Sequence, residues 1–230
     1  MMRGVLLQSP RLDVCAQMAL DAALAQMEPA DFVLRFYRWD GIAATFGYAQ
    51  RFAEVERSMP AELLRACTRR PTGGGIVLHV EDLTFSCVFP AGATLRPGDH
   101  YGRLHAAVRQ SLLDLGVEAT LCLGSGDSAP SRDGRATQCF AAPVSMDLLS
   151  GGGKILGGAI RRRGDTVLYQ GSLLRPDSRT RADEYEAAIA EGIAAEWGLE
   201  WGIRVPDAGL LSAAAELDEK FRSQEWIRRR

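Results

Sequence analysis

Residues 69–79 read RRPTGGGIVLH, and the rest of the sequence can be interpreted outward from this glycine-rich stretch. Three consecutive glycines let the backbone approach a ligand closely and turn its N–H groups toward an anion or a carbonyl oxygen. The flanking Arg69 and Arg70 could neutralise a phosphate or a carboxylate. The alternative interpretation of the same residues is an ordinary glycine-rich turn between two strands. The spacing matches neither a Walker A loop nor a dinucleotide-binding fingerprint.

A second glycine-rich segment, residues 151–159, reads GGGKILGGA and contains Lys154, one of only two lysines among 27 basic residues. A lysine in so arginine-rich a chain suggests a need for a titratable amine. Gly157 and Gly158 would leave one strand face bare beside it, where a ligand or another backbone can lie. Lys154 could then stabilise an oxyanion or lower the pKa of a nearby thiol. A solvated lysine after a glycine turn is the alternative.

Cys139 directly follows the longest predicted loop, residues 124–138. A loop of this length inside a compact domain is typical of a lid or a ligand-binding segment. A thiol at a loop-to-strand junction can be partly exposed, and Lys154 could supply the cation that a thiolate nucleophile needs. The remaining cysteines fall in predicted helices or strands and are expected to be small buried hydrophobes: Cys15, Cys67, Cys87 and Cys122.

Composition excludes several classes of protein. The chain has 230 residues, a formal net charge of −2 and 47% hydrophobic residues, which is the profile of a globular domain. It contains no apolar run long enough to span a membrane and no signal-peptide pattern, so we expect a cytoplasmic protein without a membrane partner. Near-neutral charge argues against nucleic acid as a partner. The histidines and cysteines lack metal-ligand spacing, and we expect no metal site.

The N-terminal half predicts helices alternating with hairpins. Ser9-Pro10 reads as a helix start, ahead of apolar residues at helical spacing from Leu12 to Met27. Two hairpins are predicted, over 32–46 with a turn at Asp40-Gly41, and over 76–89. The other elements expected here are a short helix over 52–66, a strand ending near Arg69-Arg70 and a helix over 99–115.

The C-terminal half predicts a three-stranded meander followed by two helices. The strands are expected over 144–149, 154–161 and 166–174, with turns at residues 150–153 and 163–165. Helices around 180–197 and 210–227 close the chain, and no repeat or linker divides it. The sequence therefore predicts a single α+β domain over residues 1–230, with antiparallel-rich mixed sheets and helices packed on them.

Several motifs together resemble one enzyme family, the catalytic domains of lipoate–protein ligase A, octanoyltransferase and biotin ligase. The stretch 69–79 is similar to the family signature, and KILGGA at 154–159 is similar to its lysine motif. Further matches follow in order along the chain: MALD at 18–21, residues 39–50, and QGSL at 170–173. The resemblance covers nearly the whole chain. It implies the family's α+β fold without an accessory C-terminal domain.

The resemblance implies an enzyme that attaches an octanoyl or lipoyl group to a lysine of a small acidic carrier. That carrier would be a lipoyl domain of a 2-oxoacid dehydrogenase E2 component or the H protein of glycine cleavage. Cys139-Phe140, fifteen residues before Lys154, resembles the nucleophile segment of the cysteine-dependent octanoyltransferases, and residues 81–86 and 219–226 also fit that subtype. The subtype implies octanoyl-acyl carrier protein as donor, a Cys139 thioester and no cofactor.

The candidate site residues form two groups. Cys139 and Lys154 would be catalytic. The substrate-binding residues would be Arg70, Thr72, Gly73, Gly74, Gly75, His79, Gly157, Gly158, Ala159, Gly171 and Ser172. Two positions depart from the family pattern: Val80 stands where an Asp usually follows the histidine, and Gln170 stands where a His often precedes Gly-Ser.

Two other functions remain open at this point. An ATP-dependent lipoate–protein ligase would form a lipoyl-adenylate with ATP and Mg, and would tolerate Cys139→Ala. A carrier-binding module without turnover would bind carriers but form no acyl-enzyme. The intact glycine loop and lysine motif speak against this second alternative.

Overall fold

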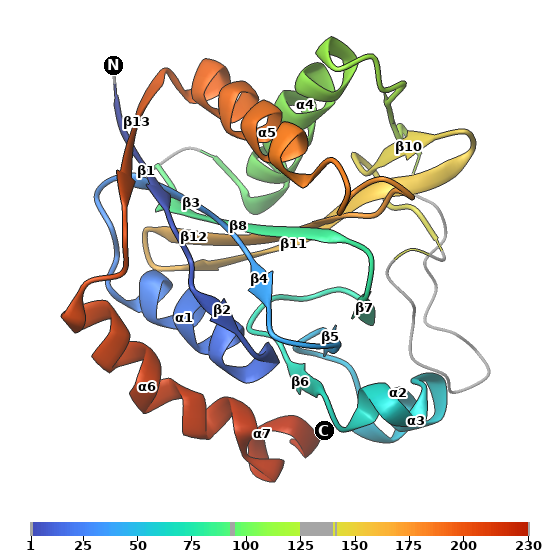
Figure 1. Ribbon diagram of the computed structural model, residues 1–230, viewed down its shortest axis with the longest axis vertical. Helices are drawn as coiled ribbons and strands as arrows, with labels where there is room; N and C mark the ends of the chain where they lie inside the picture. The colour runs from blue at the N-terminus through green and yellow to red at the C-terminus, as the bar shows by residue number, and fades with distance from the viewer. Residues whose placement is uncertain (1, 93–94, 125–139, 141, 230) are drawn as a thin grey trace.

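One large mixed sheet organises the molecule (Figure 1). The computed structural model describes residues 2–92, 95–124, 140 and 142–229. Within these residues the large sheet has the strand order β13 (Leu199–Arg204), β1 (Met2–Leu7), β3 (Phe32–Phe36), β8 (Leu83–Pro90), β12 (Thr166–Leu173), β11 (Gly153–Arg163), β10 (Leu148–Ser150) and β9 (Thr120–Leu121). β1 pairs in parallel with β13 and β3, and the other neighbouring pairs are antiparallel.

Two smaller sheets lie beside the large one. β2 (Arg11–Leu12) pairs in parallel with β4 (Arg38–Trp39). In the three-stranded sheet, the central strand β5 (Ala43–Phe46) is parallel to β6 (Cys67–Arg69) and antiparallel to β7 (Val77–His79). The short helices α2 (Phe52–Ser58) and α3 (Ala61–Leu64) pack their apolar residues against this sheet and form a separate small core.

Helices cover both faces of the large sheet (Figure 1). α4 (Pro97–Asp114) and α5 (Ala182–Trp197) lie on one face, while α1 (Val14–Gln26) and α6 (Ala208–Arg222) lie on the other; α7 (Gln224–Arg228) follows α6. Successive residues of a strand point to opposite faces, so β8 sends Phe85, Cys87 and Phe89 into the α4–α5 core and Val88 into the α1 core. Both faces of β8 are therefore buried under helices.

Local capping chemistry sets the helix ends. Asp13 accepts hydrogen bonds from the backbone N–H groups of Cys15 and Ala16, so α1 begins at Val14. The expected start at Ser9-Pro10 is wrong, because the following two residues pair with β4 as β2. At the other end of the chain, Gly198 has φ 63° and ends α5 in the left-handed conformation that glycine adopts without strain.

Strand positions are predicted better than strand partners. The meander is confirmed, since β10, β11 and β12 pair in antiparallel succession, although its first strand is confined to Leu148–Ser150. Both predicted hairpins are wrong. β3 and β5 belong to different sheets, and so do β7 and β8. A turn signal shows where the chain can reverse, but the apolar surface available at each edge decides which strands then pair.

The remaining differences occur near the chain ends and at short breaks. β1 and β13, which pair in parallel, were not predicted. The helix expected over 52–66 is interrupted at Met59-Pro60, and the one over 210–227 is interrupted at Ser223, which caps α7. The α+β class with antiparallel-rich mixed sheets is confirmed. Among the described residues, none of the helices combines the length and apolar character needed to cross a bilayer.

Candidate active site

A narrow cavity lies where β11 and β12 of the large sheet face the three-stranded sheet. Its volume is only about 30 Å³, and its wall includes seven of the predicted site residues: Arg70, His79, Gly157, Gly158, Ala159, Gly171 and Ser172. Cross-strand pairing explains part of this convergence, because Gly157 lies opposite Ser172 and Ala159 lies opposite Gln170. Two motifs separated in sequence are thus brought together by one antiparallel ladder.

The polar end of the cavity wall is a chain of hydrogen bonds. Arg70 Nη1 donates to Thr45 Oγ1 over 3.3 Å, and Thr45 Oγ1 lies 2.9 Å from His79 Nε2. His79 Nδ1 lies 2.8 Å from Asp82 Oδ2. A carboxylate beside Nδ1 favours the proton on that nitrogen, so Nε2 accepts from the Thr45 hydroxyl. The arrangement fixes the histidine ring and its tautomer in the wall.

Asp82 is a site residue that the sequence analysis missed. Its Oδ2 atom also accepts from Ser172 Oγ at 2.7 Å and from Thr84 Oγ1 at 2.8 Å. Burial alone would raise the pKa of Asp82, but His79 and the two hydroxyl groups outweigh it and lower that pKa. Val80, where the family pattern has an acid, is 45% exposed. The position of an acidic residue three residues after His79 was the feature of the sequence that could have indicated this pairing.

The glycine loop supports the cavity from behind. Thr72 and Gly73–Gly75 do not line the wall, but Thr72 Oγ1 donates to Gln170 Oε1 at 2.6 Å and Arg70 Nη2 donates to the Gly73 carbonyl at 2.5 Å. Gly74 has φ +86°, which suits glycine. A Cβ at Gly47 would lie 1.9 Å from the Gly74 carbonyl oxygen, so Gly47 is also required for this packing.

Lys154 lies outside the cavity wall, in a buried ion pair. Its Nζ atom is 2.8 Å from Asp147 Oδ2, and its side chain is only 3% exposed. Tyr101 links this pair to the glycine motif, since its hydroxyl donates to Asp147 Oδ1 at 2.5 Å and accepts from the Gly158 N–H at 3.1 Å. The ring of Phe140 lies 5.4 Å from Lys154 Nζ. The expectation of a solvated lysine is therefore excluded.

Comparison with known proteins assigns the chain to a family. The model of the lipoyl protein ligase A/B catalytic domain matches residues 13–186. The chain belongs to this family. The match extends from the cap of α1 into α5 and includes the glycine loop, the lysine motif and both strands of the cavity floor.

Individual relatives agree with this family assignment. The chain is 35% identical over 167 residues to octanoyltransferase LipM of Symbiobacterium thermophilum, an alignment that covers 68% of this chain and 60% of that protein. It is 26% identical to octanoyltransferase LipM of Staphylococcus epidermidis, with 93% of this chain and 94% of that protein covered. A crystal structure of lipoate-protein ligase A bound with ATP has a TM-score of 0.78 at 24% identity, covering 99% and 98% of the two chains, and it shows the same fold.

Gln170, the second departure from the family pattern, joins the glycine loop to α1. Besides accepting from Thr72, its Nε2 atom donates to Asp21 Oδ2 at 2.7 Å. Asp21 in turn pairs with Arg35 at 2.5 Å and accepts from the Tyr37 hydroxyl. Burial and the neighbouring Asp21 raise the pKa of Tyr37 well above its usual value, which keeps the phenol protonated. The amide of Gln170 thus accepts a hydrogen bond from Thr72 and donates one to Asp21 at the same time.

The glycines at 158 and 171 have a different role from the one expected. They are cross-strand partners, and a Cβ on either would lie 2.5–2.6 Å from atoms of Tyr169. Their bare Cα atoms make room for that ring, which is fully buried in the α4–α5 core. The side of Gly158 where a Cβ would stand is filled by Tyr169, while Gly158 itself contributes to the cavity wall.

Arg69, considered in the sequence as an anion ligand, is a structural residue. It is fully buried and donates to the carbonyls of Tyr48 and Gln50, each at 2.7 Å, and to those of Trp226 at 3.1 Å and Ile227 at 2.8 Å. Its guanidinium therefore ties the end of β6 to α7. Of the two adjacent arginines, Arg70 alone lines the cavity.

Three of the five cysteines are buried as expected. Burial raises the pKa of Cys15 and of Cys67 to about 11 and raises that of Cys87 still further, so these thiols stay protonated at neutral pH. Cys122 differs from the prediction, because it follows β9 outside any strand and is partly exposed. Cys139 and most of the loop 124–138 lie outside the described residues.

Proposed function

We propose that this chain transfers an octanoyl group from octanoyl-acyl carrier protein to a lysine of a lipoyl domain or of the glycine cleavage H protein. The observation that carries the proposal is the narrow, mainly apolar cavity floored by Gly157, Ala159 and Ser172 and flanked by Met18 and Val77. A groove of this kind suits an unbranched acyl chain. The similarity to octanoyltransferases LipM supports octanoyl as the group.

Burial of the chain would supply binding energy. The seven alkyl carbons of an octanoyl group, at about 0.8 kcal/mol each, give roughly 5–6 kcal/mol of gross stabilisation, enough to make the length of the acyl chain matter. His79 and Arg70 would stand at the polar end of the groove, held by Thr45 and Asp82. Their fixed orientation favours one position of the acyl group over others.

The chemistry would proceed through a thioester on Cys139. Its thiolate attacks the donor thioester carbon, the bond to the carrier thiol breaks, and that thiol leaves with a proton. The ε-amine of the acceptor lysine then attacks the enzyme thioester, an amide forms, and the Cys139 thiol is regenerated. Lys154 would stabilise the thiolate and the developing oxyanion. Its amine lies beneath Phe140, the residue that follows Cys139 in the chain, which supports this pairing.

The alternative is an ATP-dependent ligase that forms lipoyl-adenylate and requires ATP and Mg. The likeness of the fold to an ATP-bound lipoate-protein ligase fits this alternative equally well. The two functions differ in their donor and in their need for a cysteine. They can therefore be separated by a single comparison of acyl donors.

The test is intact-protein mass spectrometry after mixing the chain with octanoyl-acyl carrier protein in the absence of ATP. We expect the mass of one octanoyl group to be added, and to be lost in Cys139→Ala. Cys122→Ala is the matched control, because Cys122 is a partly exposed free cysteine that lies outside the cavity, and it should retain the increment. Lys154→Arg keeps the charge but raises the pKa of the side chain, and should slow acylation by about 100-fold or more.

Two results would contradict the proposal. Acylation of a lipoyl domain only when ATP and free lipoate are supplied, with Cys139→Ala fully active, would establish the ligase. Full turnover in Lys154→Arg would remove the assigned role of the lysine amine while leaving the thioester route intact.

A further inference from the structure

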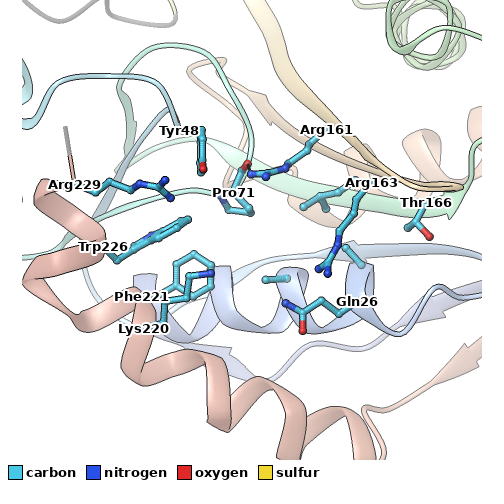
Figure 2. Close-up of a pocket in the computed structure, with 13 residues that line it drawn as sticks. Gln26, Tyr48, Pro71, Arg161, Arg163, Thr166, Lys220, Phe221, Trp226 and Arg229 are labelled. Carbon is cyan, nitrogen blue, oxygen red and sulfur yellow. Dashed lines mark hydrogen bonds between the residues drawn. The ribbon is translucent and has the colours of Figure 1, made fainter.

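A second pocket lies farther along the same face of β11 and β12 (Figure 2). Every second residue of a strand lies on the same face, and in β11 one face carries residues 157, 159, 161 and 163. The strand that floors the acyl cavity therefore continues directly into this pocket. The hollow has a volume of about 210 Å³ and is closed by residues from α1, α6 and α7. Its floor is apolar, with Leu168, Phe221 and Trp226 buried beneath it.

Four cationic side chains converge on this pocket. Arg161 and Arg163 enter from β11, Lys220 from the end of α6, and Arg229 from the residue after α7 (Figure 2). The described residues that line the pocket include no aspartate or glutamate. Across the described part of the chain, none of these four side chains forms a salt bridge. Among the residues that the structure describes, the pocket therefore holds about four positive charges without a counter-charge in its wall.

Specific contacts hold three of these cations in place. Arg161 Nη1 donates to the Pro71 carbonyl at 2.8 Å, and its guanidinium lies 4.6 Å from the centre of the Tyr48 ring. Arg229 lies 4.6 Å from the same ring and 5.0 Å from that of Trp226. Lys220 Nζ lies 4.3 Å from the Trp226 ring. Cation–π contacts of this kind orient the charges before any ligand arrives.

The grouping of like charges has an electrostatic cost. Burial lowers the pKa of Lys220, and Arg229, Arg161 and Arg163 lower it further. Burial alone would raise the pKa of the Tyr48 phenol, but Arg229 and Arg161 together outweigh it and lower that pKa. Both shifts mean that a negative charge placed in the pocket would be stabilised.

We propose that this pocket binds a phosphate-bearing ligand. A monocarboxylate would offset only one of four charges, whereas a phosphomonoester or a diphosphate carries two or more and accepts the forked N–H pairs of arginine. The faces of Tyr48 and Trp226 are covered by cations, so the phosphate rather than an aromatic base is the group recognised. The site is separate from the acyl cavity and does not depend on the proposed acyl transfer.

Isothermal titration of the full chain with pyrophosphate, at constant ionic strength, tests the proposal. We expect saturable binding that weakens at least about tenfold in both Arg163→Gln and Lys220→Gln. Arg204→Gln is the matched control, since this arginine is exposed on the edge strand β13 and outside the pocket, and its affinity should be unchanged. Circular dichroism of each variant separates loss of binding from loss of fold.

Further titrations distinguish the sources of the phosphate. Both a free phosphate or diphosphate and a protein-borne 4′-phosphopantetheine would present a phosphate group to the pocket. Whichever of pyrophosphate and 4′-phosphopantetheine binds more tightly identifies the source of that phosphate. Either result supports the site. Pantetheine without its phosphate should not bind. Absence of pyrophosphate binding, or equal binding by all the variants, overturns the proposal. Binding of a glutamate-rich peptide without binding of any phosphate compound also overturns the proposal, because the pocket would then be a docking surface for an acidic protein.

Discussion

At the scale of single residues, neighbours in sequence have separate roles because strand geometry sends them apart. Arg69 ends β6 and turns into the protein, where backbone carbonyls surround its guanidinium. Arg70 points the other way, into the wall of the acyl cavity. Both are almost fully buried. Their residue type alone indicated a common role in binding an anion, and only the backbone direction separates them.

Gly158 provides a residue-scale prediction. In Gly158→Ala the new Cβ would lie 2.5 Å from the Tyr169 ring, which is fully buried and cannot move freely, so the free energy of unfolding should fall by about 1–3 kcal/mol. Urea denaturation measures this loss. Gly98→Ala in α4 is the control, because no atom lies within 4 Å of a Cβ there, and its stability should not fall. Equal stability of the two variants would show that Tyr169 relaxes.

At the scale of elements, pairing depends on contacts that are distant in sequence. α1 packs against α6, and α4 packs against α5, across separations of about 80 residues or more. The small sheet takes β5, β6 and β7 from three segments around the glycine loop. These contacts place the two glycine motifs on opposite sides of one cavity.

The attachment of α7 gives a prediction at this scale. Arg69→Lys keeps the charge, but one ammonium cannot reach the carbonyls of Tyr48, Gln50, Trp226 and Ile227 together, and buried acceptors lose their donors. The free energy of unfolding should fall by about 2–4 kcal/mol. Hydrogen exchange should increase first in residues 224–228. Arg204→Lys, on an exposed strand, should change neither measurement; unchanged protection of 224–228 in Arg69→Lys would contradict this role.

At the scale of the whole molecule, His105 connects the two halves of the core. It projects from α4, with Nδ1 2.7 Å from the Met146 carbonyl and Nε2 2.8 Å from the Tyr169 hydroxyl. Burial lowers its pKa to about 4, although Asp147 and the Met146 carbonyl act in the opposite direction. The side chain of His105 is fully buried.

This shift predicts a pH dependence of stability. An unfolded histidine binds its proton near pH 6.5, while the folded one stays neutral down to about pH 4, so the free energy of unfolding should fall on acidification between these values. The loss should be on the order of 3 kcal/mol. His105→Gln cannot bind the proton and should show a flatter profile from pH 6.5 to 4, whatever its stability at pH 7. Parallel profiles for the two proteins would refute the assignment.

Local patterns in the sequence were enough to predict several of the elements and the chemistry of the motifs. Helical and alternating periods placed the helix over 99–115 and the meander, because those patterns depend on local geometry. The motifs carrying Arg70, His79 and Gly157–Ala159 indicated a common site, and they do converge. These features are short-range or are carried by residue type, so they can be recognised without knowing the packing.

The tertiary structure alone decided the partners. It separated the predicted hairpins into different sheets, paired Lys154 with Asp147, and brought Asp82 to His79. It also gathered Arg161, Arg163, Lys220 and Arg229 at one pocket from three segments of the chain. Burial, pairing and pKa depend on which surfaces meet in space. Since those surfaces come from distant segments, no local pattern in the sequence could specify them.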